Sequence, residues 1–393
     1  MNQKSNWKRI LLRILSYVLV AVLSAVITFF AAGYARWNDM SKLEQLEEII
    51  DIYYIEDYDL GEIEDAAAAA MVDALGNPWS YYISADDYEA YQDTHSNSFV
   101  GIGVEVLLTE DGTGLEIMGL EENGGAKEAG LLPGDIIQSV EDQPISQLGI
   151  NGATQLIRGA ESTTVSLTVL RGEENMTFEV QRKRIQVVVA TGEMLEGNIG
   201  LITISNFNER CASETIELIQ QLLEEGAESL IFDVRFNPGG YKDEMIKILD
   251  YLLPEGELFR SVDYLGNEET DRSDSKCLEI PMAVMINEDS YSAAEFFAAA
   301  LQEYDWATVV GTPSTGKSHF QIAIPMTDGS AVNLSVGKYY TPNGVSLADV
   351  GGLQPDVVVE VDEQTYRDLY YGNIPAAEDL QIAEAVQVLK TGE

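Results

Sequence analysis

The chain has 393 residues and a formal net charge of −43, with 66 acidic against 23 basic residues. This length has room for two or three domains and a sizeable core. Such a charge repels nucleic acid, so the composition argues against a DNA- or RNA-binding protein. With two histidines and two cysteines, a metal site that needs several His or Cys ligands is not expected.

Residues 1–33 are predicted to form a cytoplasmic tip and one transmembrane helix. Residues 14–32 carry no charge and are about long enough to cross a hydrocarbon core of roughly 30 Å. The first thirteen residues hold only basic charges, so the positive-inside rule places the N-terminus in the cytoplasm and the rest outside, at the cell membrane. A cleaved signal peptide is the alternative, because small residues follow the apolar run. The length of that run favours a retained anchor.

Residues 34–96 are expected to form an N-terminal helical region. Apolar residues recur at helical spacing over 43–50 and again over 63–75. The sequence G-N-P-W-S at 76–80 interrupts this pattern, because glycine and proline end helices.

Residues 97–185 predict an inserted α+β domain, with strands at 98–106, 115–118 and 136–140 and a hairpin at 165–181. A short helix is expected at 125–129 and a longer one at 152–158. The sequence G-G-A-K-E-A-G-L-L-P-G-D at 124–135 resembles the signature of PDZ domains, which bind a peptide C-terminus by strand addition. The turn Phe99-Val100-Gly101-Ile102 is then the candidate carboxylate-binding loop. An ordinary strand start with a buried glycine is the alternative for this turn.

From residue 186 to 375, strands and helices alternate, which predicts an α/β core with a largely parallel sheet. Strands are expected at 200–204, 229–234, 283–286 and 307–310. Residues 319–341 predict two strands joined at Asp328-Gly329. Residues 376–393 contain a last amphipathic helix.

Lys317 has two possible roles. The sequence G-T-P-S-T-G-K-S at 311–318 matches the phosphate-binding pattern G-x-x-x-x-G-K-[ST]. That site requires a helix directly after the lysine. Here Phe320, Ile322 and Ile324 alternate with other residues and Pro325 follows, which predicts a strand. A nucleotide site is therefore disfavoured.

The second role for Lys317 is the general base of a Ser-Lys hydrolase, with Ser292 as nucleophile. A lysine with a pKa near 10.4 is protonated at neutral pH, so burial must lower its pKa. We expect apolar cover from Phe296, Phe297 and Phe320, and no carboxylate close by. Ser292 also begins S-A-A-E, a capping box, and most such serines only cap a helix.

Several motifs occur together in one order: D-V-R-F-N-P-G-G at 233–240, S-Y-S-A-A-E at 290–295, T-G-K-S-H-F-Q at 315–321, Y-T-P-N-G at 340–344 and G-L-Q-P-D at 352–356. With the PDZ signature, this set resembles the carboxyl-terminal processing peptidases, or tail-specific proteases. Three residues depart from the family pattern: Tyr291 and Ala294 flank the serine, and Ser318 follows the lysine.

The resemblance implies a serine endopeptidase with a crotonase-like core, and the predicted anchor makes it membrane-bound and extracytoplasmic. It assigns Ser292 as nucleophile, Lys317 as base and Gln321 as the residue that orients the lysine. Oxyanion donors are implied at Ala293 and at Gly239 or Gly240. The PDZ domain is expected to bind substrates with apolar C-termini.

Three further expectations accompany this assignment. Arg158 is a candidate relay between the PDZ domain and the active site, with a solvated surface arginine as the alternative. No cofactor is implied, and a homodimer is a further expectation.

The alternative function is a catalytically impaired PDZ scaffold. Cys211 and Cys277 could form a disulfide in an external protein or remain free thiols.

Overall fold

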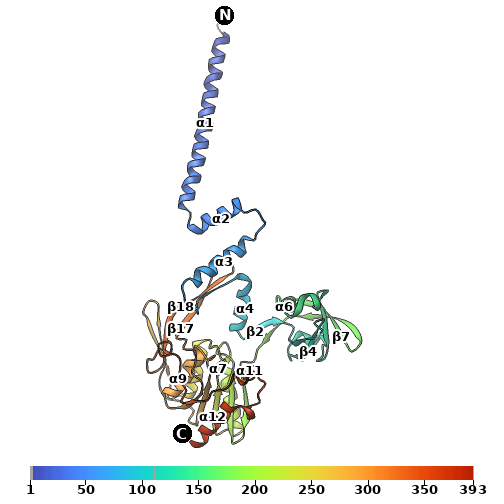
Figure 1. Ribbon diagram of the computed structural model, residues 1–393, viewed down its shortest axis with the longest axis vertical. Helices are drawn as coiled ribbons and strands as arrows, with labels where there is room; N and C mark the ends of the chain where they lie inside the picture. The colour runs from blue at the N-terminus through green and yellow to red at the C-terminus, as the bar shows by residue number, and fades with distance from the viewer. Residues whose placement is uncertain (1–2, 110, 393) are drawn as a thin grey trace. The chain divides into compact units, whose positions relative to one another are not determined.

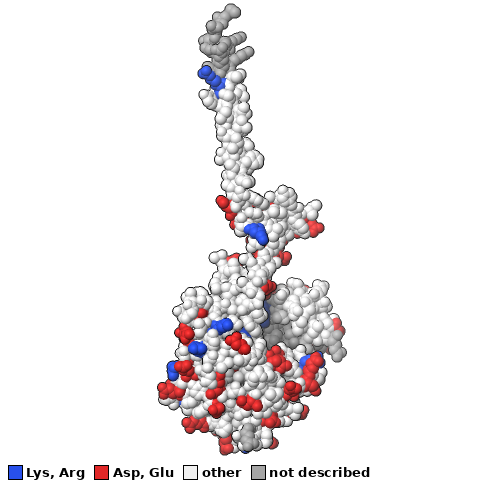
Figure 2. Space-filling view, turned by 60° about the vertical axis from the view of Figure 1, so that its left-hand side comes forward, with Lys and Arg blue, Asp and Glu red and all other residues white. Residues whose placement is uncertain are grey.

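The computed structural model describes residues 3–109 and 111–392, which form two compact units divided between Glu64 and Asp65 (Figure 1). The first unit contains α1 (Gln3–Asp39), α2 (Lys42–Tyr53) and the start of α3 (Leu60–Asp73). Within α1, Leu11–Asp39 is apolar and long enough to cross a membrane, with a mean hydropathy of 2.5 in its most apolar window. This stretch is drawn almost entirely white in Figure 2, whereas acidic side chains are scattered over the visible face of the second unit.

A six-stranded sheet forms the core of the second unit, in the order β10-β11-β12-β15-β16-β19. All neighbours from β11 to β19 are parallel, and β10 pairs antiparallel at one edge. The predicted, largely parallel sheet is therefore confirmed. Its strands are β10 (Ala190–Leu195), β11 (Ile199–Ile204), β12 (Ser229–Asp233), β15 (Met282–Ile286), β16 (Ala307–Gly311) and β19 (Val357–Val358).

Helices cover both faces of this sheet. One face packs against α7 (Cys211–Glu224), α8 (Lys242–Leu252) and α9 (Ala293–Glu303) in a shared hydrophobic core. The other face packs against α12 (Leu380–Thr391). In β12, Leu230 and Phe232 face the first core and Ile231 faces the second, so every residue of the strand is buried. Burial on both faces explains why this strand is a continuous apolar run in the sequence.

A second sheet joins distant segments of the chain. Its order is β1 (Tyr81–Ile83), β18 (Ala331–Tyr340), β13 (Gly256–Asp263) and β14 (Glu268–Ser273), and β17 (His319–Pro325) also pairs with β18. Strand β1 was not predicted. It lies in the region expected to be helical, before α4 (Ala85–His95), and pairs antiparallel with β18. The segment before the inserted domain therefore contributes a strand to the sheet that also contains β17, the strand that follows Lys317.

The inserted domain has the predicted α+β composition. Its sheet runs β3 (Val104–Leu108), β4 (Leu115–Leu120), β5 (Ile136–Val140), β7 (Thr164–Arg171) and β8 (Glu174–Gln181), with the short β6 (Gln143–Pro144) beside β5. The helices are α5 (Gly125–Ala129) and α6 (Ile145–Ile157), and α6 begins earlier than predicted, with a kink at Gly149. The single strand expected at 98–106 is interrupted at Gly103, whose φ of +73° ends β2 (Ser98–Gly101) before β3 begins.

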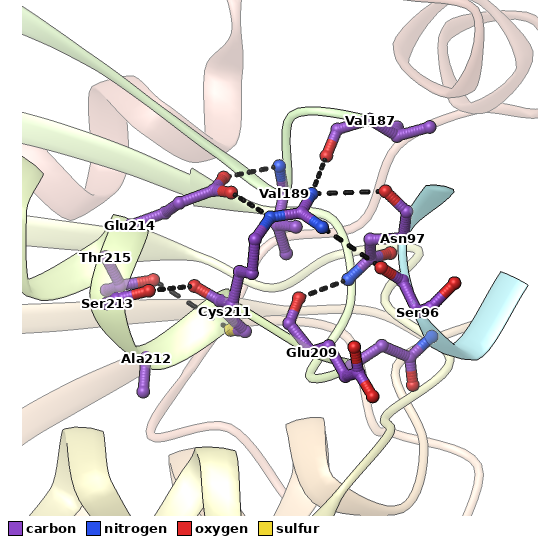
Figure 3. Close-up of polar contacts among 12 residues, drawn as sticks. Ser96, Asn97, Val187, Val189, Glu209, Cys211, Ala212, Ser213, Glu214 and Thr215 are labelled. Atoms are coloured by element: carbon purple, nitrogen blue, oxygen red, sulfur yellow. Dashed lines mark hydrogen bonds and ion pairs between the residues drawn. The ribbon is translucent and has the colours of Figure 1, made fainter. Parts of the chain in front are cut away.

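The chain enters and leaves the inserted domain through one two-stranded ribbon. Strand β2 pairs antiparallel with β9 (Lys183–Gln186). The guanidinium of Arg210 donates to the carbonyls of Ser96, Asn97 and Val187 and to the carboxylate of Glu214 (Figure 3). It therefore connects α7 to both chain segments that link the inserted domain to the core. Arg210 adopts a left-handed backbone conformation, with φ of 73°. One side chain therefore fastens both linkers of the domain to the core.

Candidate active site

Ser292 lies in a fixed turn between β15 and α9. The hydroxyl of Ser290 donates to the carbonyl of Val234 over 2.7 Å and accepts from the N–H of Asn287, which joins this turn to the residue directly after β12. Ser292 itself has φ 58° and ψ −126°, an unusual conformation for a residue with a side chain. It is only 7% exposed. Strained backbone of this kind is concentrated at functional sites, because the surrounding structure must enforce it.

Glu295 connects the two residues expected to perform the chemistry. Its Oε2 accepts the backbone N–H groups of Ser292 and Lys317, each over 2.8 Å. Its Oε1 accepts the N–H of Gly316 over 2.6 Å and the hydroxyl of Ser314 over 2.5 Å. The carboxyl is fully buried, and this burial raises its pKa although the hydrogen bonds oppose the shift. The sequence identified Glu295 only as a helix-capping residue, and its contact with the loop before Lys317 was missed.

The amine of Lys317 lies over two aromatic rings. Its Nζ is 4.6 Å from the ring centroid of Trp79 and 5.5 Å from that of Tyr291, and the two centroids are 5.7 Å apart. Burial lowers the pKa of Lys317 to about 8, with the charge of Glu295 acting in the opposite direction. The depressed pKa has the direction that a general base requires.

The prediction of which groups surround Lys317 was wrong in two respects. Phe296 and Phe297 are fully buried in the main core, and Phe320 stacks on Tyr339 at 4.8 Å, so the cover near the amine comes from Trp79 and Tyr291. The expectation of no nearby carboxylate also fails, because Glu295 binds the backbone of Lys317. Burial outweighs this negative charge in its effect on the lysine pKa.

Residues 311–318, which match the phosphate-binding pattern, have a different structural role. Strand β17 begins at His319, two residues after Lys317, so the predicted strand is confirmed and no helix follows the lysine. The N–H groups of Gly316 and Lys317, which would face a phosphate in a nucleotide site, donate to Glu295. The loop therefore surrounds an internal carboxylate.

Of the two glycines expected near the oxyanion, Gly239 adjoins Ser292. A Cβ on Gly239 would lie 2.7 Å from the Cβ of Ser292, so only glycine allows this approach. The N–H of Gly239 already donates to Oδ1 of Asn237 over 2.8 Å, which disfavours it as an oxyanion donor. Gly240 forms a bridge with Phe207, and Ala293 is the first residue of α9. Ala293 and Gly240 are the remaining candidate donors.

Gln321 has different partners from those expected. Its Nε2 donates to the carbonyl of His319 over 2.8 Å and to the hydroxyl of Ser335 over 3.1 Å. Across residues 3–109 and 111–392, no hydrogen bond joins Gln321 to Lys317. The hydroxyl of Ser335 donates in turn to Oδ1 of Asn77 over 3.2 Å, in the loop that carries Trp79. A direct orienting role for Gln321 is therefore not observed in this conformation.

The segment predicted as a carboxylate-binding turn is mostly buried, and its residues 99–101 lie in strand β2 instead of a turn. Val100 is 4% exposed and Ile102 is 1% exposed, and the carbonyl of Ile102 accepts the N–H of Ala126 at the start of α5. The guanidinium carbon of Arg158, directly after α6, lies 5.5 Å from the ring centroid of Phe99. The structure thus brings Arg158 and Phe99 together beside the ribbon that joins the inserted domain to the core.

Comparisons with known proteins agree with this architecture. Residues 198–359 match the family described as Peptidase family S41, and residues 100–181 match the PDZ domain. The carboxy-terminal processing protease CtpA of Bacillus subtilis (strain 168) is 30% identical over 359 residues, which cover 88% of this chain and 76% of that protein. A probable CtpA-like serine protease of Staphylococcus aureus (strain COL) is 27% identical over 398 residues, covering 98% of this chain and 78% of that protein.

Among solved structures, a putative S41 protease from Bacteroides fragilis NCTC 9343 shares the fold, with a TM-score of 0.51 and 16% identity. The match covers 86% of this chain and 93% of that one. The identity to the Bacillus subtilis protein and the coverage of both chains establish the relationship. The chain belongs to peptidase family S41, as a carboxy-terminal processing serine protease with a PDZ domain.

Proposed function

We propose that the chain is a membrane-anchored, extracytoplasmic endopeptidase with a Ser292–Lys317 catalytic dyad. One observation carries the proposal: a single carboxylate oxygen of Glu295 accepts hydrogen bonds from the backbone N–H groups of both Ser292 and Lys317. The lowered pKa of Lys317 supports it further, because it brings the amine close to the pH range in which a general base works well.

In the proposed reaction, the hydroxyl oxygen of Ser292 attacks the scissile carbonyl carbon while the neutral amine of Lys317 takes the hydroxyl proton. The backbone N–H groups of Ala293 and Gly240 would stabilise the oxyanion. The lysine ammonium then gives its proton to the leaving amine, and water hydrolyses the acyl-enzyme by the same steps in reverse. No cofactor takes part in this scheme.

The experiment uses the full chain in detergent and an unfolded reporter protein with an apolar C-terminus. We expect Ser292→Ala and Lys317→Ala each to reduce cleavage by about a thousandfold or more. The controls are Ser213→Ala and Lys276→Ala, at exposed positions of the same residue types, which should keep full activity. Tail binding without cleavage in the unmodified chain would instead support the PDZ scaffold.

The PDZ domain is proposed to capture apolar substrate tails by strand addition, with the carboxylate near residues 99–102. Because Arg158 lies over Phe99, we propose that tail binding acts on the core through this pair. Arg158→Ala should leave tail affinity within about twofold and remove the stimulation of cleavage by the tail. Equal stimulation in the variant and the unmodified chain would reject this role.

The apolar stretch of α1 is proposed to anchor the protein, with the N-terminus in the cytoplasm. Protease added to intact cells should remove residues 65–393 and protect the N-terminus. The exposed apolar residues of α2, including Leu43, Leu46 and Ile49, are the proposed face of a homodimer. Crosslinking of the full chain in membranes, with and without Leu46→Glu, tests this assembly.

A further inference from the structure

The amine of Lys317 is held by aromatic faces alone in the part of the chain that the structure describes. No hydrogen bond or ion pair within residues 3–109 and 111–392 reaches its Nζ, although its backbone N–H is bound by Glu295. The nearer ring, at 4.6 Å, belongs to Trp79, which precedes the PDZ domain in the sequence. The second ring belongs to Tyr291, directly before Ser292. We call Trp79 and Tyr291 the two-ring seat.

We propose that Trp79 and Tyr291 are positioning residues that seat the amine of Lys317 for proton transfer from Ser292. This inference rests on the proposed role of Lys317 as the base. It assigns a function to a loop, residues 76–80, that lies far from the serine and lysine in sequence.

A ring suits this task better than a carboxylate. A carboxylate would hold the amine strongly but would favour the ammonium form and so raise the lysine pKa. A ring face attracts the ammonium more weakly and still contacts the neutral amine. The rings also exclude water, which lowers the pKa by desolvation. The seat therefore fixes the amine while leaving it able to lose its proton.

The position of Trp79 is itself fixed by hydrogen bonds. The backbone N–H of Trp79 donates to Oδ1 of Asn77 over 2.9 Å, and its backbone carbonyl accepts from the side-chain amide of Asn333 over 3.3 Å. Asn77 Oδ1 also accepts the hydroxyl of Ser335, which accepts from Gln321. Gln321 thus reaches the lysine through Ser335 and the Trp79 loop, which gives it an indirect positioning role.

Three titratable groups either affect the pKa of Lys317, respond to its charge or contact its amine. Glu295 raises the lysine pKa, and its own pKa is raised by burial. Burial first, and then positive neighbours that include Lys317, lower the pKa of His319. Burial also raises the pKa of the Tyr291 phenol. Of these groups, only Tyr291 contributes a ring to the seat.

The first measurement does not depend on catalysis. In full-length Ser292→Ala protein, the rate of trace acetylation of Lys317 is followed against pH by peptide mass spectrometry, with and without Trp79→Leu. We expect the apparent pKa of the amine to rise in Trp79→Leu, because leucine leaves room for water and this hydration outweighs the loss of the ring's weaker attraction for the ammonium. Trp79→Phe should restore the original profile. Tyr264→Leu is the control, since Tyr264 is 75% exposed on the β13–β14 turn.

The second measurement is kinetic, in the Ser292-containing chain. We expect Trp79→Leu to lower kcat about tenfold, the scale of one partly buried cation–π contact, with KM changed less than twofold. Trp79→Phe should recover most of the loss. If Trp79→Leu fails to fold, Ser335→Ala provides the second variant, since it breaks the link between Gln321 and Asn77 and should shift the labelling profile in the same direction.

An unchanged labelling profile in the leucine variant, or in Ser335→Ala, overturns the proposal. An increase in kcat also overturns it, because the rings would then hold the amine away from the serine. Failure of the proposed dyad gives a different result: Lys317→Ala would remain active while the labelling profile still shifted with Trp79→Leu.

Discussion

The backbone N–H groups of Ser292 and Lys317 donate to the same oxygen of Glu295, each over 2.8 Å. This shared acceptor joins the start of α9 to the loop before β17, so the two residues cannot move apart without breaking a buried, charge-assisted hydrogen bond. It also shows how an acidic protein can accommodate the proposed lysine base: the nearby carboxylate is bound to backbone donors, and the amine is left to aromatic rings.

The first prediction concerns the pH dependence of cleavage. Because burial lowers the pKa of Lys317 to about 8, the reactive neutral form should increase as pH rises through this value. We expect kcat/KM to rise about tenfold per pH unit below 8 and then level off. Lys317→Arg should be inactive, since a guanidinium stays protonated. A midpoint below pH 6.5 would point to His319, whose pKa burial lowers from that value.

The second prediction concerns Glu295. Glu295→Ala should lower the free energy of unfolding by about 3 kcal/mol or more and abolish activity, because several buried donors lose their acceptor. Glu295→Gln should cost about 1–3 kcal/mol, since one side of the amide cannot accept. Thermal unfolding followed by circular dichroism measures both changes. Glu217→Gln, at an exposed position on α7, is the control and should have little effect.

Glu295 should also give stability a specific pH dependence. Its folded pKa is raised above 4.5, so the folded state binds the proton more tightly than the unfolded state. Stability contributed by this group is therefore present at low pH and is lost as pH rises from 4.5 through the folded pKa. Glu295→Gln should remove that loss, and an identical pH profile in the variant would contradict the assignment.

The third prediction concerns the linkers of the PDZ domain. Arg210→Gly removes the guanidinium but suits the left-handed backbone, so its effect reports the side chain. In this variant the carbonyls of Ser96, Asn97 and Val187 and the carboxylate of Glu214 lose the guanidinium as their shared donor. We therefore expect amide hydrogen exchange at Val187 and Val189 to accelerate about 10- to 100-fold. Arg272→Ala, an exposed arginine on β14, is the matched control. Unchanged exchange would show that β2–β9 pairing alone holds the linkers.

The fourth prediction concerns the cysteines, which are both free thiols in the structure. Burial raises the pKa of the Cys211 thiol to about 12, whereas Cys277 is partly exposed. A thiol-specific reagent at pH 8 should label Cys277 in the native protein and Cys211 only after unfolding. Denatured, unreduced protein should yield two thiols per chain. A yield of none would indicate a disulfide instead.

Much of the site could be predicted from the sequence because its signals are local. The strand before Ser292, the helix after it and the strand periodicity after Lys317 each appear within a few residues. The surroundings of the amine could not be predicted in this way. Strand β1 is only three residues long and is stabilised by β18, so it leaves no periodic pattern. Phe296 and Phe297 were wrongly expected at the site because closeness in sequence does not determine which face of a helix a side chain occupies.

The pairing of β1 with β18 joins two segments that lie far apart in the sequence. Asn333 meets Trp79 across a separation of 254 residues, so the tryptophan emerges during synthesis long before its partners exist. Contacts of such long range form late in folding. If the two-ring seat is needed for proton transfer, Trp79 cannot position the amine until β18, which carries Asn333, has been synthesised.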